Sequence, residues 1–156
     1  MTTESIEAIR REVVVSTTQQ RAFEVFTQHM TDWWPADHHI GSAPIEEIVI
    51  EPREGGRWFT RHQDGTETST GYVRVWDPYE RLALAWQLSA DFQFDPKLLT
   101  TVELSFVAEG PDRTRVRLEH RDLENYGPEA PRMRQLFDGP GAWEATLAAY
   151  AGVASR

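Results

Sequence analysis

Two histidines, His62 and His120, are the residues of this sequence best placed for proton-transfer chemistry. His62 alternates with Trp58 and Thr60 along one β-like run, and His120 continues the apolar alternation that includes Leu118. Because successive side chains of a strand point to opposite faces, this parity directs both imidazoles inward. An inward pair could bind a carbonyl group or act as acid and base, since imidazole titrates near neutral pH. The alternative is a histidine that is hydrogen-bonded within the core.

Tryptophan is unusually frequent, with six residues in a chain of 156. Indole is large, flat and apolar and has a single N–H donor, so widely spaced tryptophans often meet in space. There they either fill a core or wall a cavity for an apolar ligand, and the sequence leaves both outcomes open. The side chains that we expect to contact such a ligand are Trp33, Trp34, His38, Trp58, His62, Trp86, His120 and Trp143. Phe106 is expected to line the same space.

The segment 33–41 carries a further pair of imidazoles in Asp37-His38-His39. Neighbouring residues point apart, and the sequence lacks a His-x3-His pattern or a three-residue ligand set beside them. We therefore expect no metal site, and nothing in the sequence indicates a cofactor. The segment is expected to form part of a pocket mouth, with a purely structural loop as the alternative.

The charge balance limits the possible partners. The formal net charge is −9, from 16 basic and 25 acidic side chains, so we expect neither a nucleic-acid nor a membrane partner. The first residues lack the features of a signal peptide, and no apolar run reaches the roughly 18 residues that would span a bilayer. A cytoplasmic protein with one domain over 1–156 is the expectation.

The elements that must position these side chains follow from periodicity and turn residues. A strand is predicted at 9–15, followed by a helix within 17–30 that Thr17 or Thr18 can cap, and then by a loop over 36–44. Short β-rich runs separated by Gly, Pro and Asp then indicate an antiparallel meander. The six runs are 45–50, 57–62, 67–76, 81–88, 100–108 and 114–121.

The last third of the chain has helical spacing. Residues 131–137 predict a short helix, and 142–154 a terminal helix with Trp143 and Tyr150 on one face, separated by a break at 138–141. A seven-stranded sheet with one apolar face needs a cover, and the terminal helix is the element long enough to provide it. The predicted fold class is therefore α+β, with a curved antiparallel sheet around a C-terminal helix.

This order of elements, together with the residues between them, resembles the START-like or SRPBCC superfamily with its helix-grip fold. Within it, the chain is similar to the bacterial homologues of the heat-shock chaperone ATPase activator. One departure is visible, because the family's usual Gly-Trp pair is here Gly141-Ala142-Trp143, which predicts a shifted start of the last helix. The matching motifs are Phe26-Thr27, Trp33-Trp34, Glu51-Pro52-Arg53-Glu54-Gly55-Gly56-Arg57-Trp58, Gly71-Tyr72-Val73, Asp77-Pro78, Arg81-Leu82 with Trp86, Leu118-Glu119-His120 and Gly141-Ala142-Trp143.

The resemblance implies a cavity between sheet and helix, which superfamily members use for lipids, hormones or polyketides. Our first hypothesis is accordingly the binding of a hydrophobic aromatic or acyl-bearing small molecule. The second is an enzyme resembling polyketide cyclases and aromatases, or a hydrolase, that uses His62 or His120. The third is a chaperone-associated interaction module, although the eukaryotic activator has an additional chaperone-binding N-terminal domain that we do not expect here.

Two further features bear on these hypotheses. Phe92 and Phe94 fall in a loop with apolar side chains, and such a loop can gate a pocket or join a homodimer interface. Arg61 and Arg74 could contact an acidic ligand if the strand parity shifts by one residue, which is common at strand boundaries.

Overall fold

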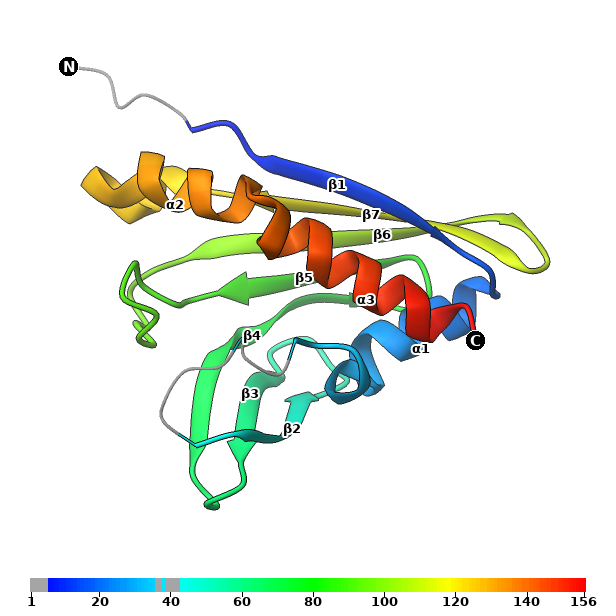
Figure 1. Cartoon of the computed structure of the whole chain (residues 1–156), viewed down its shortest axis with the longest axis horizontal. Helices are drawn as coiled ribbons and strands as arrows, with labels where there is room; N and C mark the ends of the chain where they lie inside the picture. Colours follow the sequence, from blue (N-terminus) through cyan, green and yellow to red (C-terminus); the bar gives the residue numbers. More distant parts are fainter. Residues whose placement is uncertain (1–5, 36–37, 39–42) are drawn as a thin grey trace.

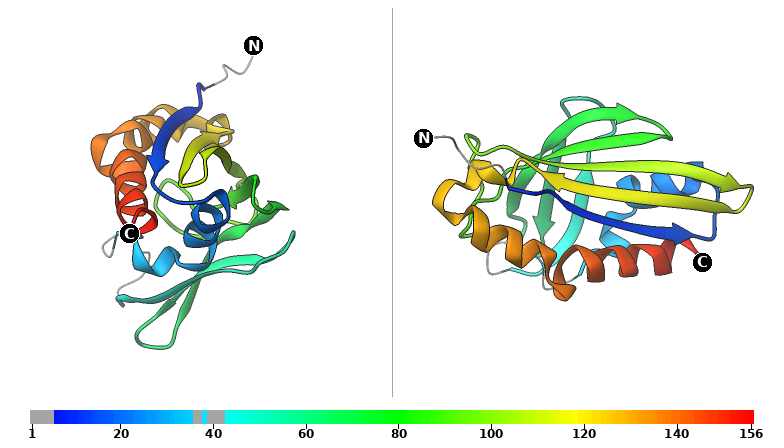
Figure 2. Two further views of the ribbon diagram at one scale, coloured as in Figure 1. Left: turned by 90° about the vertical axis from the view of Figure 1, so that its right-hand side faces the viewer. Right: turned by 90° about the horizontal axis from the view of Figure 1, so that it is seen from above.

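The computed structural model describes residues 6–35, 38 and 43–156. Seven strands form one antiparallel sheet in the order β1-β7-β6-β5-β4-β3-β2. The sheet is strongly curved, and the helices lie against its concave side (Figures 1 and 2). The strands are β1 (Ile9–Val15), β2 (Ile45–Ile50), β3 (Arg57–His62), β4 (Glu67–Asp77), β5 (Arg81–Trp86), β6 (Thr100–Gly110) and β7 (Arg113–Arg121).

The helices form two groups, one between β1 and β2 and the other after β7. The first group is α1 (Gln19–Gln28) with the short turn η1 (Met30–Asp32), and the second is η2 (Leu123–Glu129), α2 (Ala130–Asp138), the π-helical turn η3 (Pro140–Glu144) and α3 (Ala145–Ala154). The helices α2 and α3 follow one another along one side of the sheet (Figure 2). No helix within 6–35 or 43–156 is long and apolar enough to cross a membrane.

The predicted architecture is confirmed, and the strand parity explains it. Along β7 the side chains of Thr114, Val116, Leu118 and His120 are all buried, while the residues between them are at least partly exposed. The helix α1 begins at the predicted cap, where the Thr18 hydroxyl accepts a hydrogen bond from the Arg21 amide at 3.1 Å. Alternation and capping thus determine which face of each element is apolar.

The C-terminal helix is divided, as the break at 138–141 predicted. The division is a π-helical turn, in which Ala142 leaves helical geometry with φ −98° and ψ −123°. A π turn accommodates one residue more than a regular helical turn, and such turns are frequent at functional sites. Ala142, the additional residue between Gly141 and Trp143, therefore lies in the π-helical turn, where the helical region changes direction.

One half of the space beneath the helices is a packed core. Phe23 and Phe26 of α1 contact Phe106 edge-on, with ring centroids 5.2 and 6.1 Å apart. Phe26 also contacts Tyr150 of α3, whose hydroxyl donates a 2.7 Å hydrogen bond to the Ala22 carbonyl. These rings join α1, α3 and the sheet, so Phe106 lies in the space between sheet and helices as part of the packed core.

Gly71 on β4 provides a direct test of the sheet geometry. It pairs with Trp58 on β3 and with Trp86 on β5, and a Cβ at this position would lie 1.7 Å from the Ala85 carbonyl oxygen. We predict that Gly71→Ala lowers the free energy of unfolding by about 2 to 4 kcal/mol, because strand backbones must separate. Chemical denaturation measures this change.

The matched control for this substitution is Gly152→Ala in α3. A Cβ there meets no atom within 4 Å. Because alanine favours the helical backbone over glycine, the control should leave stability unchanged or raise it by up to about 1 kcal/mol. Equal effects of the two substitutions would contradict the close approach of β4 and β5.

Candidate functional site

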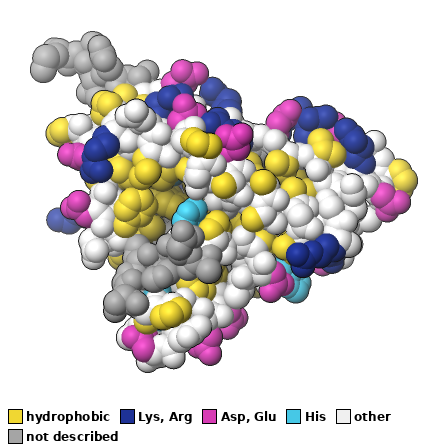
Figure 3. Space-filling model, viewed as in Figure 1, with side chains coloured by type: hydrophobic (Ala, Val, Ile, Leu, Met, Phe, Trp, Pro, Cys, Tyr) yellow, Lys and Arg dark blue, Asp and Glu magenta, His cyan; other side chains and the backbone are white. Residues whose placement is uncertain are grey.

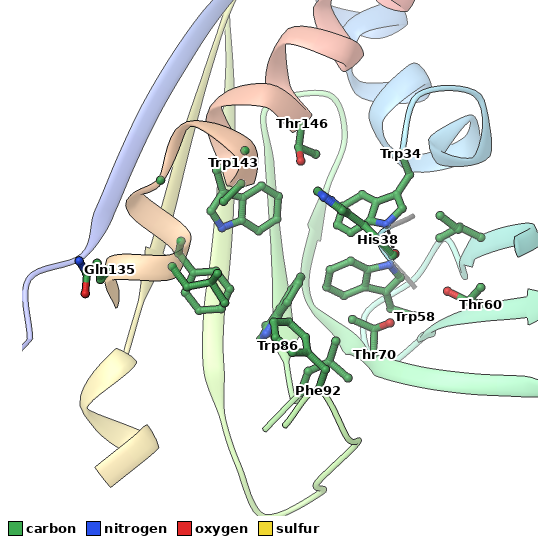
Figure 4. A pocket seen from close by; sticks show the side chains of 17 residues that line it. Trp34, His38, Trp58, Thr60, Thr70, Trp86, Phe92, Gln135, Trp143 and Thr146 are labelled. Atoms are coloured by element: carbon green, nitrogen blue, oxygen red, sulfur yellow. Dashed lines mark hydrogen bonds between the residues drawn. The ribbon is translucent and has the colours of Figure 1, made fainter. Parts of the chain in front are cut away.

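The other half of the space beneath the helices is a cavity of about 640 Å³. It lies between the sheet and the segment that runs from α2 through η3, and Figure 4 shows aromatic side chains around it. The residues that line it are Trp34, His38, Ile48, Trp58, Thr60, Thr70, Trp86, Leu88, Phe92, Gln135, Leu136, Phe137, Gly139, Gly141, Ala142, Trp143 and Thr146. A volume of this size can hold a multi-ring small molecule.

Four of the indoles that line the cavity form one contact cluster along its wall. The ring centroids of Trp58 and Trp86 are 5.8 Å apart, and those of Trp86 and Trp143 are 5.7 Å apart. Trp34 completes the cluster, at 6.1 Å from Trp143 and 6.4 Å from Trp58. All four contacts are edge-to-face, which is a favoured aromatic geometry. We call these four residues the tryptophan cluster.

Gly71 lies in register between two members of the tryptophan cluster, Trp58 and Trp86 on the neighbouring strands. A Cβ at this position would collide with the Ala85 backbone of β5. The glycine therefore permits the close approach of β4 to β5, the strand that carries Trp86.

His120 lies behind the cavity and holds Trp143 in place. The Trp143 indole N–H donates to His120 Nδ1 at 3.1 Å. Since Nδ1 accepts, the proton is on Nε2, which donates to the Thr100 hydroxyl at 2.9 Å. That hydroxyl in turn donates to the Trp86 carbonyl at 2.8 Å. The resulting chain of three hydrogen bonds connects η3 with β7, β6 and β5.

The environment of His120 keeps its imidazole neutral. The side chain is fully buried, and this burial lowers its pKa to about 3. Its two nitrogens are already engaged, and it is not among the lining residues. His120 is therefore the hydrogen-bonded core histidine that the sequence left as the alternative, and the expected contact of its side chain with a ligand is not made at this cavity lining.

His62 is also inward and also outside the cavity. Its Nδ1 lies 2.9 Å from the Ala43 carbonyl, which can only accept, so Nδ1 is the donor, and its Nε2 lies 2.8 Å from the Thr68 hydroxyl. The two histidines are on β3 and β7, with three strands between them. The parity prediction holds for both side chains, but the predicted acid–base pair does not form.

Trp33 and Trp34 are neighbours in sequence with different surroundings. The Trp33 indole donates to the Val25 carbonyl at 3.0 Å and packs on Phe26 and Tyr150, with ring centroids 4.9 and 5.3 Å away. It belongs to the packed core, so its expected contact with a ligand is wrong. Trp34 instead belongs to the tryptophan cluster, where it contacts Trp58 and Trp143.

His38 is the remaining histidine at the cavity. The Trp34 indole N–H donates to the His38 carbonyl at 2.7 Å, and the His38 amide donates to the Pro35 carbonyl at 2.9 Å. These two bonds hold His38 beside Trp34, as Figure 4 shows. Among the lining residues that the structure describes, His38 is the only histidine. His39 lies outside the described residues.

The sequence reasoning missed several lining residues. Phe137, Gly141 and Ala142 reach the cavity because the helical region turns at η3, and only the Gly-Pro-Gly break indicated this bend. Thr60 and Thr70 could have been found from strand parity. Phe92 was expected as a possible gate, and it does line the opening, with a left-handed backbone at φ 56° and an exposed fraction of 38%. Such a backbone is strained for a bulky residue.

The family model described as "Activator of Hsp90 ATPase homolog 1-like protein" matches residues 16–149 of this chain. The chain belongs to this family. The resemblance read from the sequence motifs is therefore confirmed, and none of the curated proteins compared with this chain matches it.

Solved structures give further similarities. An anthrahydroquino-γ-pyrone synthase is 35% identical over 98% of this chain and 99% of its own, with a TM-score of 0.68. A self-sacrificing resistance protein from Micromonospora echinospora is 25% identical, over 94% of this chain and 93% of its own, with a TM-score of 0.71. A Nitrosomonas europaea protein at 14% identity and a TM-score of 0.67 shares the fold, with coverage of 94% and 93%.

The neutral state of His120 predicts a pH dependence of stability. With a pKa of about 3 in the folded state and about 6.5 when unfolded, His120 takes up its proton on unfolding at intermediate pH. Its contribution is fully present above pH 6.5 and falls as the pH is lowered toward 3. Between pH 6.5 and 5 we predict a loss of roughly 2 kcal/mol in the free energy of unfolding.

Urea denaturation at the two pH values measures this loss, above the range in which unfolded carboxylates titrate. His120→Asn, which keeps an acceptor for Trp143, should remove most of the pH difference, and His29→Gln on the exposed surface should retain it. An unchanged pH difference in His120→Asn would show that His120 is not held neutral.

Proposed function

We propose that this protein binds a flat, hydrophobic aromatic molecule in the cavity, against the tryptophan cluster. The observation that carries this proposal is the set of four mutually contacting indoles that line a cavity of about 640 Å³. Membership of the family and the similar synthase support a ligand-binding or cyclase-type role. The aromatic character of the ligand is inferred from the walls of the site.

Aromatic chemistry fits these walls better than an acyl chain. A planar ring system can meet several indoles face-on or edge-on, and each aromatic pair contributes about 0.5 to 1.5 kcal/mol beyond area burial. A flexible chain gains no such pairing and loses rotational freedom on binding. Burial of about 150 Å² of aromatic surface is worth some 4 kcal/mol before association costs, so polar contacts are needed for tight binding. Thr60, Thr70, Gln135 and Thr146 supply hydroxyl and amide groups at the lining.

Trp34 offers a test of binding because it lines the cavity and is only half-buried. We predict that Trp34→Ala weakens the binding of 9-anthracenemethanol, a neutral planar probe, by at least about tenfold, which corresponds to about 1.4 kcal/mol. Isothermal titration calorimetry measures the dissociation constants.

The control is Trp76→Ala. Trp76 is likewise half-buried, but it packs on Phe23 at 5.0 Å and does not line the cavity, so its removal should change the affinity by less than twofold. The proposal fails if neither this probe nor other planar aromatic molecules bind the native protein, or if both variants weaken binding equally.

A cyclase-type reaction is the second candidate, and His38 is the observation that favours it. Its imidazole could take the proton of a phenol on a bound substrate, and the resulting phenolate oxygen could then form a bond to an electron-poor carbon of the same molecule. The imidazolium would return the proton to the adjacent carbon. Such a ring closure is an isomerisation, so it requires no oxidant or reductant.

The cyclisation of 2′-hydroxychalcone to flavanone is a suitable probe because it follows these steps. If His38 is catalytic, His38→Gln should lower the rate by about 100-fold or more with little change in binding, while the surface variant His29→Gln should retain it. The loss of chalcone absorbance measures the rate. A native rate equal to the uncatalysed rate, or one unaffected by His38→Gln, would exclude this role.

A further inference from the structure

We infer that the cavity selects its ligands by charge, and that it accepts uncharged or cationic aromatic molecules and rejects those with a carboxylate or phosphate. This inference rests on the proposed function, since it concerns the occupant of the same site. It excludes fatty acids, acyl groups on phosphate-bearing carriers and aromatic acids. It therefore removes part of the ligand range that the sequence left open.

The described part of the cavity lining carries no lysine or arginine. Its residues are apolar or carry neutral hydroxyl and amide groups, with His38 as the one histidine among them. The segments outside the described part, 1–5, 36–37 and 39–42, contain neither residue type in their sequence. A buried anion without a cationic partner carries a large desolvation cost.

The arginines of the strands that line the cavity bind to groups outside it. Arg61 on β3 pairs with Glu47 at 3.0 Å and with Glu67 at 3.5 Å on the outer side of the sheet. Arg74 on β4 donates to the Thr101 hydroxyl at 2.8 Å. Neither side chain is among the lining residues, so the shift in parity that would turn them toward an acidic ligand has not occurred.

The arginines near the helix side of the cavity are also held by other partners. Arg134 of α2 donates to the Glu7 carbonyl at 2.9 Å and lies 3.6 Å from the Asp138 carboxylate. Arg11 donates to the same carboxylate at 2.6 Å. These guanidinium groups are held by carboxylate and carbonyl oxygens near the N-terminal strand, and a ligand in the cavity would have to displace them from these partners.

The electrostatic field of the whole protein also disfavours anionic ligands. The net charge of −9 opposes the approach of anions and favours that of cations. Figure 3 shows the hollow on this face lined by hydrophobic atoms, with charged side chains around its margins. Indole faces can also attract a cation through their π electrons, so a positive group is tolerated where a negative group is not.

Three molecules with the same ring system test the inference at pH 7. They are 9-anthracenemethanol, 9-anthracenecarboxylate and 9-(aminomethyl)anthracene, which are neutral, anionic and cationic. We expect the carboxylate to bind at least about tenfold more weakly than the alcohol, and its deficit to shrink as salt screens the repulsion. The amine should bind within about threefold of the alcohol or more tightly. A carboxylate that binds as well as the alcohol would overturn the inference.

A pair of lysine variants distinguishes the lining from the overall charge. Thr70→Lys places a cation at the cavity, whereas Gln63→Lys adds the same charge at the exposed turn after β3. The carboxylate should gain at least about tenfold in affinity relative to the alcohol only in Thr70→Lys. Equal affinities for the carboxylate in the two variants would contradict selection by the lining.

The proposed function and the charge inference can fail separately. If the alcohol does not bind the native protein, the proposed function fails and the charge inference fails with it. If the alcohol binds but the carboxylate binds equally well, the binding function stands and only the charge inference is overturned. Thermal melting of both lysine variants checks that they remain folded, so that a loss of all binding by unfolding is recognised.

Discussion

The mutual edge-to-face contact of four indoles is the interaction on which the rest of this structure depends. Trp34 follows η1, Trp58 lies on β3, Trp86 on β5 and Trp143 in η3, so the tryptophan cluster connects four segments of the chain. All four indoles also line the cavity, so their mutual contacts determine the shape of its apolar wall.

Two residues outside the cavity lining support the tryptophan cluster. Gly71 permits the close approach of β4 to β5, which carries Trp86, and His120 orients Trp143 through a chain of hydrogen bonds that ends on the Trp86 backbone. A buried imidazole with both nitrogens satisfied is a rigid support and a poor proton carrier. The chemistry first expected of His120 is thus replaced by a structural role at the same site.

The fold could be predicted because strand alternation, turn glycines and prolines and the helix cap all agree, as they do at 9–15 and 57–62. The histidines show the limit of this reasoning. Parity correctly directs His62 and His120 inward, but whether an inward side chain reaches a cavity depends on what packs above it. Likewise, nothing in the pair Trp33-Trp34 indicates which indole joins the core, because that choice depends on the distant partners Phe26 and Trp58.

The resonances of the six indole N–H groups provide the most direct test that the tryptophan cluster lines a ligand site. In a titration of the ¹⁵N-labelled protein with a neutral anthracene alcohol, the account predicts large shifts for Trp34, Trp58, Trp86 and Trp143. Trp33 in the packed core and Trp76 beside Phe23 should remain nearly unchanged. Shifts that are absent at saturating ligand, or that are as large for Trp33 and Trp76 as for the other four, would contradict it.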